Sequence, residues 1–120
     1  MLPSEPLELR YYATEQGHSP FERWFLGLDQ AAAARVVTAL ERLSRGNLSN
    51  TKAVGAGVLE HRIDWGPGYR VYFGRDGEKL VVLLMGGTKQ RQPRDIDTAK
   101  LFWADYKQRR DRRGGVRLWH

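Results

Sequence analysis

Apolar and polar side chains alternate near the start of the chain and then change to helical spacing. Residues 7–12, Leu-Glu-Leu-Arg-Tyr-Tyr, have the alternation that predicts a half-buried strand. Ser19 followed by Pro20 is typical of a helix start, with Glu22 three residues after the serine. A short helix is therefore predicted over residues 20–28, and its apolar face comprises Phe21, Trp24, Phe25 and Leu28.

A second helix is predicted directly after the first. Asp29 can cap it, and Gly46 is suited to end it after about Arg45. Four consecutive alanines at 31–34 favour a helix and close packing, and they indicate no chemistry. The predicted buried stripe consists of Val36, Val37, Leu40 and Leu43.

The middle of the chain has the pattern of a three-stranded antiparallel meander. Residues 47–56 have the polar, glycine-containing composition of a loop. Strands are predicted over residues 58–65 and 69–74, which a Gly-Pro-Gly turn joins. A tight turn at Asp76-Gly77 then leads to a buried strand over residues 79–85.

Helical spacing returns near the end of the chain. A third helix is predicted from Arg94 to about Arg110, with Asp95 and Asp97 complementing the dipole of its first turn. Residues 111–120 are expected to form a basic, flexible tail, which leaves residues 1–110 as one domain. Because helices occur only before and after the strands, the predicted class is α+β: a small antiparallel β-sheet with two N-terminal helices and one C-terminal helix.

Charge is distributed unevenly along the 120 residues. The chain has 20 Lys and Arg against 14 Asp and Glu, a net charge of +6. Residues 1–50 hold five basic and six acidic side chains, whereas residues 51–120 hold 15 and eight. A basic C-terminal half favours a polyanionic partner, since neutralised phosphates dominate nucleic-acid affinity. The alternative is a basic surface that only keeps the protein in solution.

Several classes of chemistry are excluded or disfavoured. The absence of cysteine excludes disulfides and thiolate metal sites, and the three histidines lack metal-binding spacing, so no metal and no cofactor are predicted. Fingerprints of nucleotide-binding loops and of nucleophilic triads are missing. Without a leader or an apolar run of about 20 residues, the chain is expected to be cytoplasmic and not bound to a membrane.

Two neighbouring strands are predicted to bring polar side chains together. Glu60 and Arg62 alternate with apolar residues on the first strand, and Arg70 and Tyr72 occupy the same face of the next. The helices are expected to cover the other face, with His61 turned toward them as a core histidine. Past a predicted break at Gly86-Gly87, two more cations, Lys89 and Arg91, can curl over the open face. The alternative is a solvated sheet face with ordinary ion pairs.

Such a set of groups suits RNA cleavage by the substrate's own 2′-hydroxyl. The nucleophile then belongs to the RNA, and the protein needs only to align the attacking oxygen, stabilise charge on the phosphorus and protonate the leaving oxygen. Arginine matches phosphate in a two-pronged geometry.

The segments that carry these residues resemble a known family. They are Gly-Pro-Gly-Tyr-Arg-Val-Tyr-Phe at 66–73, Leu-Leu-Met-Gly-Gly-Thr-Lys at 83–89, and Asp95-Ile96 opening a helix with Ala99 and Trp103. Over residues 7–110 the chain is similar to the RelE/ParE superfamily of type II toxin-antitoxin toxins, in particular its HigB-like branch of addiction module killer proteins. The resemblance implies an mRNA endoribonuclease (an mRNA interferase) that inhibits translation, commonly in the ribosomal A site.

The resemblance also implies site residues. By position, Arg62, Arg70 and Lys89 correspond to the catalytic basic residues, and the predicted RNA-binding residues are Glu60, Tyr72, Arg91, Arg94 and Asp95. The chain departs from the family where RelE has a C-terminal catalytic tyrosine, because no tyrosine precedes Tyr106 in that region. Asp95, Lys89 or Arg91 is expected to take over the acid role.

The implied partners are mRNA on the ribosome, a helix-turn-helix antitoxin (HigA-like) encoded next to the toxin, and operator DNA bound by the toxin-antitoxin complex. Two alternatives remain open at this point. One is a ParE-like toxin that inhibits DNA gyrase by protein contact. The other is a catalytically inactive, basic nucleic-acid-binding or regulatory protein of the same fold.

Overall fold

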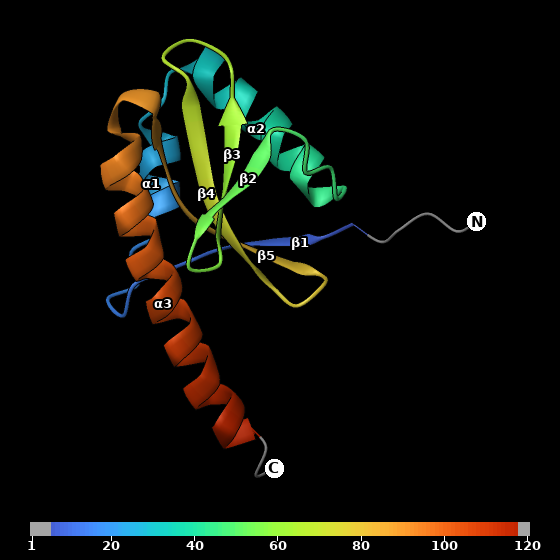
Figure 1. Cartoon of the computed structure of the whole chain (residues 1–120), viewed down its shortest axis with the longest axis vertical. Helices are drawn as coiled ribbons and strands as arrows, with labels where there is room; N and C mark the ends of the chain where they lie inside the picture. The colour runs from blue at the N-terminus through green and yellow to red at the C-terminus, as the bar shows by residue number, and fades with distance from the viewer. Residues whose placement is uncertain (1–5, 118–120) are drawn as a thin grey trace, which may run out of the picture.

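A computed structural model describes the backbone of residues 6–117 and the side chains through residue 112. The elements form a small single-domain α+β structure (Figure 1). In chain order they are β1 (Glu8–Tyr11), α1 (Pro20–Leu26), α2 (Gln30–Ser44), β2 (Thr51–Gly55), β3 (Val58–Ile63), β4 (Tyr69–Asp76), β5 (Leu80–Thr88), the 3-10 turn η1 (Lys89–Arg91) and α3 (Gln92–Arg117).

The sheet has five strands in the order β1-β5-β4-β3-β2. Strands β2 to β5 form an antiparallel meander, whereas β1 pairs in parallel with β5, with Leu9 opposite Val81. The sheet is therefore mixed, and the prediction of a purely antiparallel sheet is wrong. The first strand satisfies the hydrogen-bonding edge that the last strand of the meander leaves open, a long-range pairing that local alternation does not encode.

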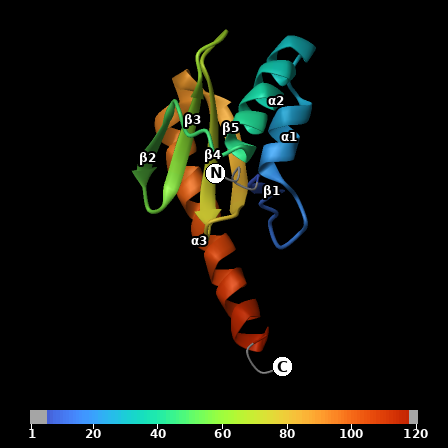
Figure 2. The same ribbon diagram turned by 90° about the vertical axis from the view of Figure 1, so that its right-hand side faces the viewer.

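Helices cover both faces of the sheet (Figure 2). One apolar cluster joins α1 and α2 to residues such as Val71 and Phe73. A second joins α3, through Ala99 and Trp103, to the opposite side chains, among them Tyr72. The prediction that this second face is open is thus wrong, because the apolar stripe of α3 needs an apolar surface to bury.

Local signals at the first two helices are confirmed. The side chain of Ser19 accepts a hydrogen bond from the backbone of Glu22 at 3.2 Å, and the carboxylate of Asp29 accepts one from Ala32 at 2.8 Å. The buried stripe of α2 differs from the prediction. Its buried residues are Ala32, Val36, Ala39 and Leu43, while Val37 is exposed.

Two strand boundaries also differ from the prediction. The segment expected to be a loop contains β2, which adds an edge strand to β3. Strand β5 does not break at Gly86-Gly87 but continues to Thr88. A β-carbon on Gly86 would lie 2.1 Å from the ring of Trp24, and one on Gly87 would lie 2.0 Å from Oδ2 of Asp95. These glycines therefore allow α1 and α3 to approach the strand closely.

The C-terminal helix is longer than predicted at both ends. It begins at Gln92, where Pro93 suits the first turn, and ends at Arg117. Two phenols attach it to the sheet layer: Tyr12 donates to Asp105 at 2.6 Å, and Tyr106 donates to Asp76 at 2.7 Å. The flexible tail expected for residues 111–120 stays a prediction, and residues 118–120 lie outside the described part.

We expect the attachment of α3 to weaken in alkali. Burial, followed by the hydrogen bond to a carboxylate, raises the pKa of both Tyr12 and Tyr106 to about 12 from an ordinary 10.0. Since the folded pKa is the higher one, this stabilisation is complete below pH 10 and is lost as the pH rises through about 12. Urea unfolding between these pH values checks the prediction, and Tyr106→Phe should flatten the loss. A pH profile in Tyr12→Phe and Tyr106→Phe that is identical to the profile of the wild type would contradict it.

Candidate nucleic-acid interface

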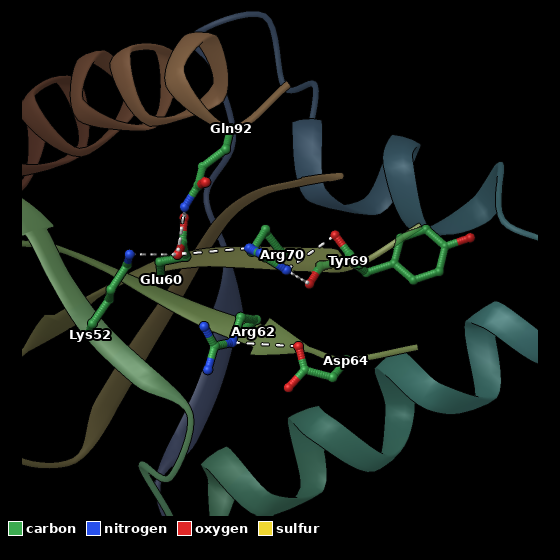
Figure 3. A network of polar contacts seen from close by, with 8 residues as sticks. Lys52, Glu60, Arg62, Asp64, Tyr69, Arg70 and Gln92 are labelled. Carbon is green, nitrogen blue, oxygen red and sulfur yellow. Dashed lines mark hydrogen bonds and ion pairs between the residues drawn. The ribbon is translucent and has the colours of Figure 1, made fainter. Parts of the chain in front are cut away.

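A largely buried polar cluster lies between the sheet and the start of α3, and we use the name polar cluster for Glu60, Arg70, Tyr72, Gln92 and Asp95. Figure 3 shows Glu60, Arg70 and Gln92 of this cluster. The Gln92 amide donates to both carboxylate oxygens of Glu60, at 3.0 and 2.8 Å. Nε of Arg70 lies 3.8 Å from the same carboxylate. Glu60 and Arg70 have only 1% and 5% of their surface exposed, so this pair is shielded from solvent.

Strand register explains why these side chains meet. Glu60 lies opposite Tyr72, and Arg62 lies opposite Arg70, so their side chains share one sheet face. Arg70 also lies opposite Gly87, over which Asp95 is placed. The guanidinium of Arg70 is held further by the turn between β3 and β4, since Nη1 donates to the carbonyls of Gly68 and Tyr69 at 3.2 Å each.

Three atoms of the polar cluster are buried without a hydrogen bond to any described residue: Arg70 Nε, the Tyr72 hydroxyl and Asp95 Oδ2. Burial raises the pKa of Asp95, although the charges of Arg91 and Arg94 oppose the shift. Burial, followed by the charge of Glu60, raises the pKa of Tyr72. Both groups are therefore harder to ionise than they are in water, and the Tyr72 hydroxyl can act as a hydrogen-bond donor.

Exposed cations surround the polar cluster; we call Lys52, Arg62, Lys89, Arg91 and Arg94 the basic rim. Nζ of Lys52 lies 3.9 Å from Glu60 across the β2–β3 pair. Lys89 packs beside Gly68, where a β-carbon would lie 3.3 Å from Cβ of Lys89 and 3.4 Å from Nη1 of Arg70. Arg62 contacts Asp64 at 3.5 Å, with both side chains exposed.

The arrangement can bind and polarise a phosphate. The basic rim supplies mobile, solvated cations that suit the backbone of a nucleic acid. Arg70 lies beneath them with fixed orientation, where its charge is less screened by water than a surface charge. The geometry therefore combines attraction at the surface with a prearranged cation below it.

The structure brings together most of the predicted site residues but changes their setting. Arg62, Lys89, Arg91 and Arg94 are exposed, as a contact with RNA requires. The other four predicted residues are buried in the polar cluster and do not lie on an open sheet face. They are Glu60, Arg70, Tyr72 and Asp95. The N-terminal turn of α3 covers them, which the strand pattern alone does not predict.

The sequence pattern does not predict two residues near the polar cluster, Lys52 and Gln92. Lys52 falls in a segment predicted to be a loop, whereas it lies opposite Glu60 on β2. Gln92 follows the predicted basic cluster by one residue, and only the packing of α3 shows that its amide meets Glu60. His61 faces α2 as predicted, is buried, and its Nδ1 lies 3.1 Å from the Thr51 hydroxyl.

In the part of the chain that the structure describes, no group of three or more His, Asp and Glu side chains is arranged to hold a metal ion. Within residues 6–117, no helix combines the length and apolar character that crossing a membrane requires.

Comparison with known families defines the class of the protein. The family described as phage-derived protein Gp49-like (DUF891) matches residues 23–104, which include the polar cluster and the basic rim. The chain belongs to this family, which is a RelE/ParE-like toxin family. An uncharacterised protein of Haemophilus influenzae is 43% identical over 83 residues, which cover 68% of this chain and 84% of the relative.

Proposed function

We propose that the protein is the toxin of a type II toxin-antitoxin system of the HigB-like kind and acts as an mRNA endoribonuclease. The observation that carries the proposal is the fixed Arg70 of the polar cluster beneath the exposed cations Arg62 and Lys89. Membership of a RelE/ParE-like toxin family supports the same conclusion. Cleavage stops translation of the message that is cut.

In the proposed reaction the RNA supplies its own nucleophile. The 2′-hydroxyl of one nucleotide attacks the adjacent phosphorus and gives its proton to solvent water, while the bond to the 5′-oxygen of the next nucleotide breaks and that oxygen takes a proton from the protein. The products are a 2′,3′-cyclic phosphate and a 5′-hydroxyl end. Arg62 and Lys89 contact the phosphate, while Arg70 stabilises the developing negative charge from below.

The leaving 5′-oxygen needs a proton, and we assign its delivery to Lys89 and Asp95. Lys89 is exposed and lies next to Arg70, so it can reach a phosphate at the surface. Asp95 is buried, and burial raises its pKa, so it holds its proton more readily than an exposed carboxyl does. Tyr106 is excluded from this role, because its hydroxyl donates to Asp76 and its ring stacks on Trp103.

The proposed partners follow from the same function. The substrate is mRNA on the ribosome, and a helix-turn-helix antitoxin encoded next to the toxin holds it inactive. The basic rim suits an acidic antitoxin segment as well as RNA, since both present negative charge. The complex of the two proteins is proposed to bind its operator DNA.

Brief expression of the toxin in bacteria without its antitoxin tests the proposal. We expect growth to stop and new mRNA 5′-ends to appear within translated codons, while Lys89→Gln, which removes an exposed cation, should reduce both effects at equal protein level. Growth arrest with intact message and an SOS response would contradict the nuclease and indicate a gyrase inhibitor. Normal growth with soluble wild-type protein would indicate an inactive binding protein.

A further inference from the structure

A hollow lies between α2 and the C-terminal end of β3, and we call it the α2–β3 pocket. Its volume is about 410 Å³, within the range of about 300–1,000 Å³ typical of small-ligand sites. The charged and aromatic residues of its lining are Arg35, Arg42, His61, Arg62, Asp64 and Trp65. Two small residues of α2, Ala34 and Ala39, also line it and leave the space open.

The pocket is positively charged. Arg35 and Arg42 are two turns apart on one side of α2, and both are exposed. Neither has an ion-pair partner among the described residues, whereas Arg62 contacts Asp64 at 3.5 Å. The two guanidiniums on α2 therefore give the pocket its charge, which favours an anionic ligand.

His61 forms part of the pocket lining. Burial, followed by the charge of Arg42, lowers its pKa, so the ring is neutral at pH 7. Nδ1 lies 3.1 Å from the Thr51 hydroxyl, and Nε2 makes no hydrogen bond to a described residue. The ring therefore keeps one nitrogen available for a ligand.

One wall of the α2–β3 pocket is aromatic, because Trp65 forms part of its lining. Trp65 stacks on Tyr69 with ring centroids 6.2 Å apart and an interplanar angle of 24°. Cζ of Arg35 lies 5.3 Å from the centroid of the Trp65 ring. Nucleic-acid bases stack on aromatic rings and on guanidinium planes, so this wall can bind a base. The charges of Arg35 and Arg42 can bind the phosphate of the same nucleotide.

We propose that the α2–β3 pocket binds one nucleotide of the RNA strand, with its phosphate at Arg35 and Arg42 and its base against Arg35 and Trp65. This inference rests on the proposed function for the identity of the strand. Arg62 belongs to both the pocket and the basic rim, so an RNA strand can pass from one site to the other.

The lining favours a nucleotide over an acidic peptide. Asp64 can accept hydrogen bonds from the N–H groups of a base, whereas an acidic side chain offers it no donor. Asn50 supplies an amide that can donate or accept. A ligand with phosphate, hydrogen-bond donors and a flat ring satisfies all these groups together.

Binding of nucleoside monophosphates to the full-length protein tests the inference without requiring cleavage. We expect AMP, GMP, CMP or UMP to shift the indole N–H resonance of Trp65 in NMR titrations. Arg42→Gln should weaken this binding about tenfold, as expected for one charge-assisted contact. The matched control is Arg23→Gln, an exposed arginine on α1, which should bind like wild type.

The outcomes separate this inference from the proposed function. Mononucleotide binding that Arg42→Gln weakens supports the pocket even if the wild-type protein cuts no RNA. If RNA is cut, Arg42→Gln should raise KM about tenfold with little change in kcat. Absence of mononucleotide binding, equal affinity for inorganic phosphate, or binding of an acidic peptide alone would each overturn the inference.

Discussion

Replacing Arg70 by lysine is expected to reduce RNA cleavage about 100-fold, the usual effect of losing one prearranged donor at a developing charge. Lysine keeps the positive charge beside Glu60, so the protein should still fold. It cannot keep the present geometry, in which Nη1 donates to the carbonyls of Gly68 and Tyr69 while Nε faces Glu60. An ammonium lacks this planar set of donors.

The effect of Arg70→Lys is best measured as the single-turnover rate of cleavage of mRNA on purified ribosomes. Its control is Arg23→Lys on α1, which lies with α2 on the other side of the sheet from α3 (Figure 2). Unfolding in urea gives the stability of both variants. A cleavage rate within threefold of wild type would contradict the assignment of Arg70.

Replacing Glu60 by alanine is expected to lower the free energy of unfolding by about 3 kcal/mol. The change leaves the buried guanidinium of Arg70 without its carboxylate and the amide of Gln92 without its acceptor. Both members of the ion pair are more than nine-tenths buried, so water cannot replace the lost contacts.

Two further variants serve as controls for the Glu60 prediction. Asp64→Ala removes the carboxylate of an exposed ion pair just after β3, the strand that carries Glu60. This change should alter the free energy of unfolding by only about 0.5 kcal/mol. Arg70→Met combined with Glu60→Ala removes both charges and should recover part of the loss. Equal destabilisation by Glu60→Ala and Asp64→Ala, measured in urea, would show that the buried pair does not stabilise the fold.

Local parts of the fold were predictable from the sequence because their causes are local. Ser19 and Asp29 cap α1 and α2 with their own side chains, so the signal and the structure lie within a few residues. Alternation along β3 placed His61 toward α2 and Glu60 on the other face, because successive side chains of a strand point to opposite sides.

Long-range packing was not predictable in the same way. The parallel pairing of β1 with β5 joins segments about 70 residues apart, and no turn signal links them. Gly86 and Gly87 were interpreted as a strand end, since a single sequence does not distinguish a break from a close approach. Trp24 and Asp95 occupy the space that two side chains would need.

The candidate site illustrates the same division. Register along β3 and β4 predicted which charged residues share a face, and the structure brings Arg62, Arg70 and Lys89 together. The burial of Arg70 was not predicted, because Gln92 and Asp95 belong to α3, which packs over Glu60 and Gly87 beside it. The candidate site therefore consists of the buried polar cluster with the exposed basic rim around it, whereas the sequence predicted an open basic face.

The chemistry of the cut RNA ends tests the central claim most directly. The purified protein is added to translating ribosomes, and the new 5′-ends of the message are assayed for ligation with and without prior phosphorylation by a polynucleotide kinase. The account predicts 5′-hydroxyl ends within codons, paired with 2′,3′-cyclic phosphates, and their loss with Arg70→Lys. Ends that carry a 5′-phosphate, or a message that the folded wild-type protein leaves intact, would contradict it.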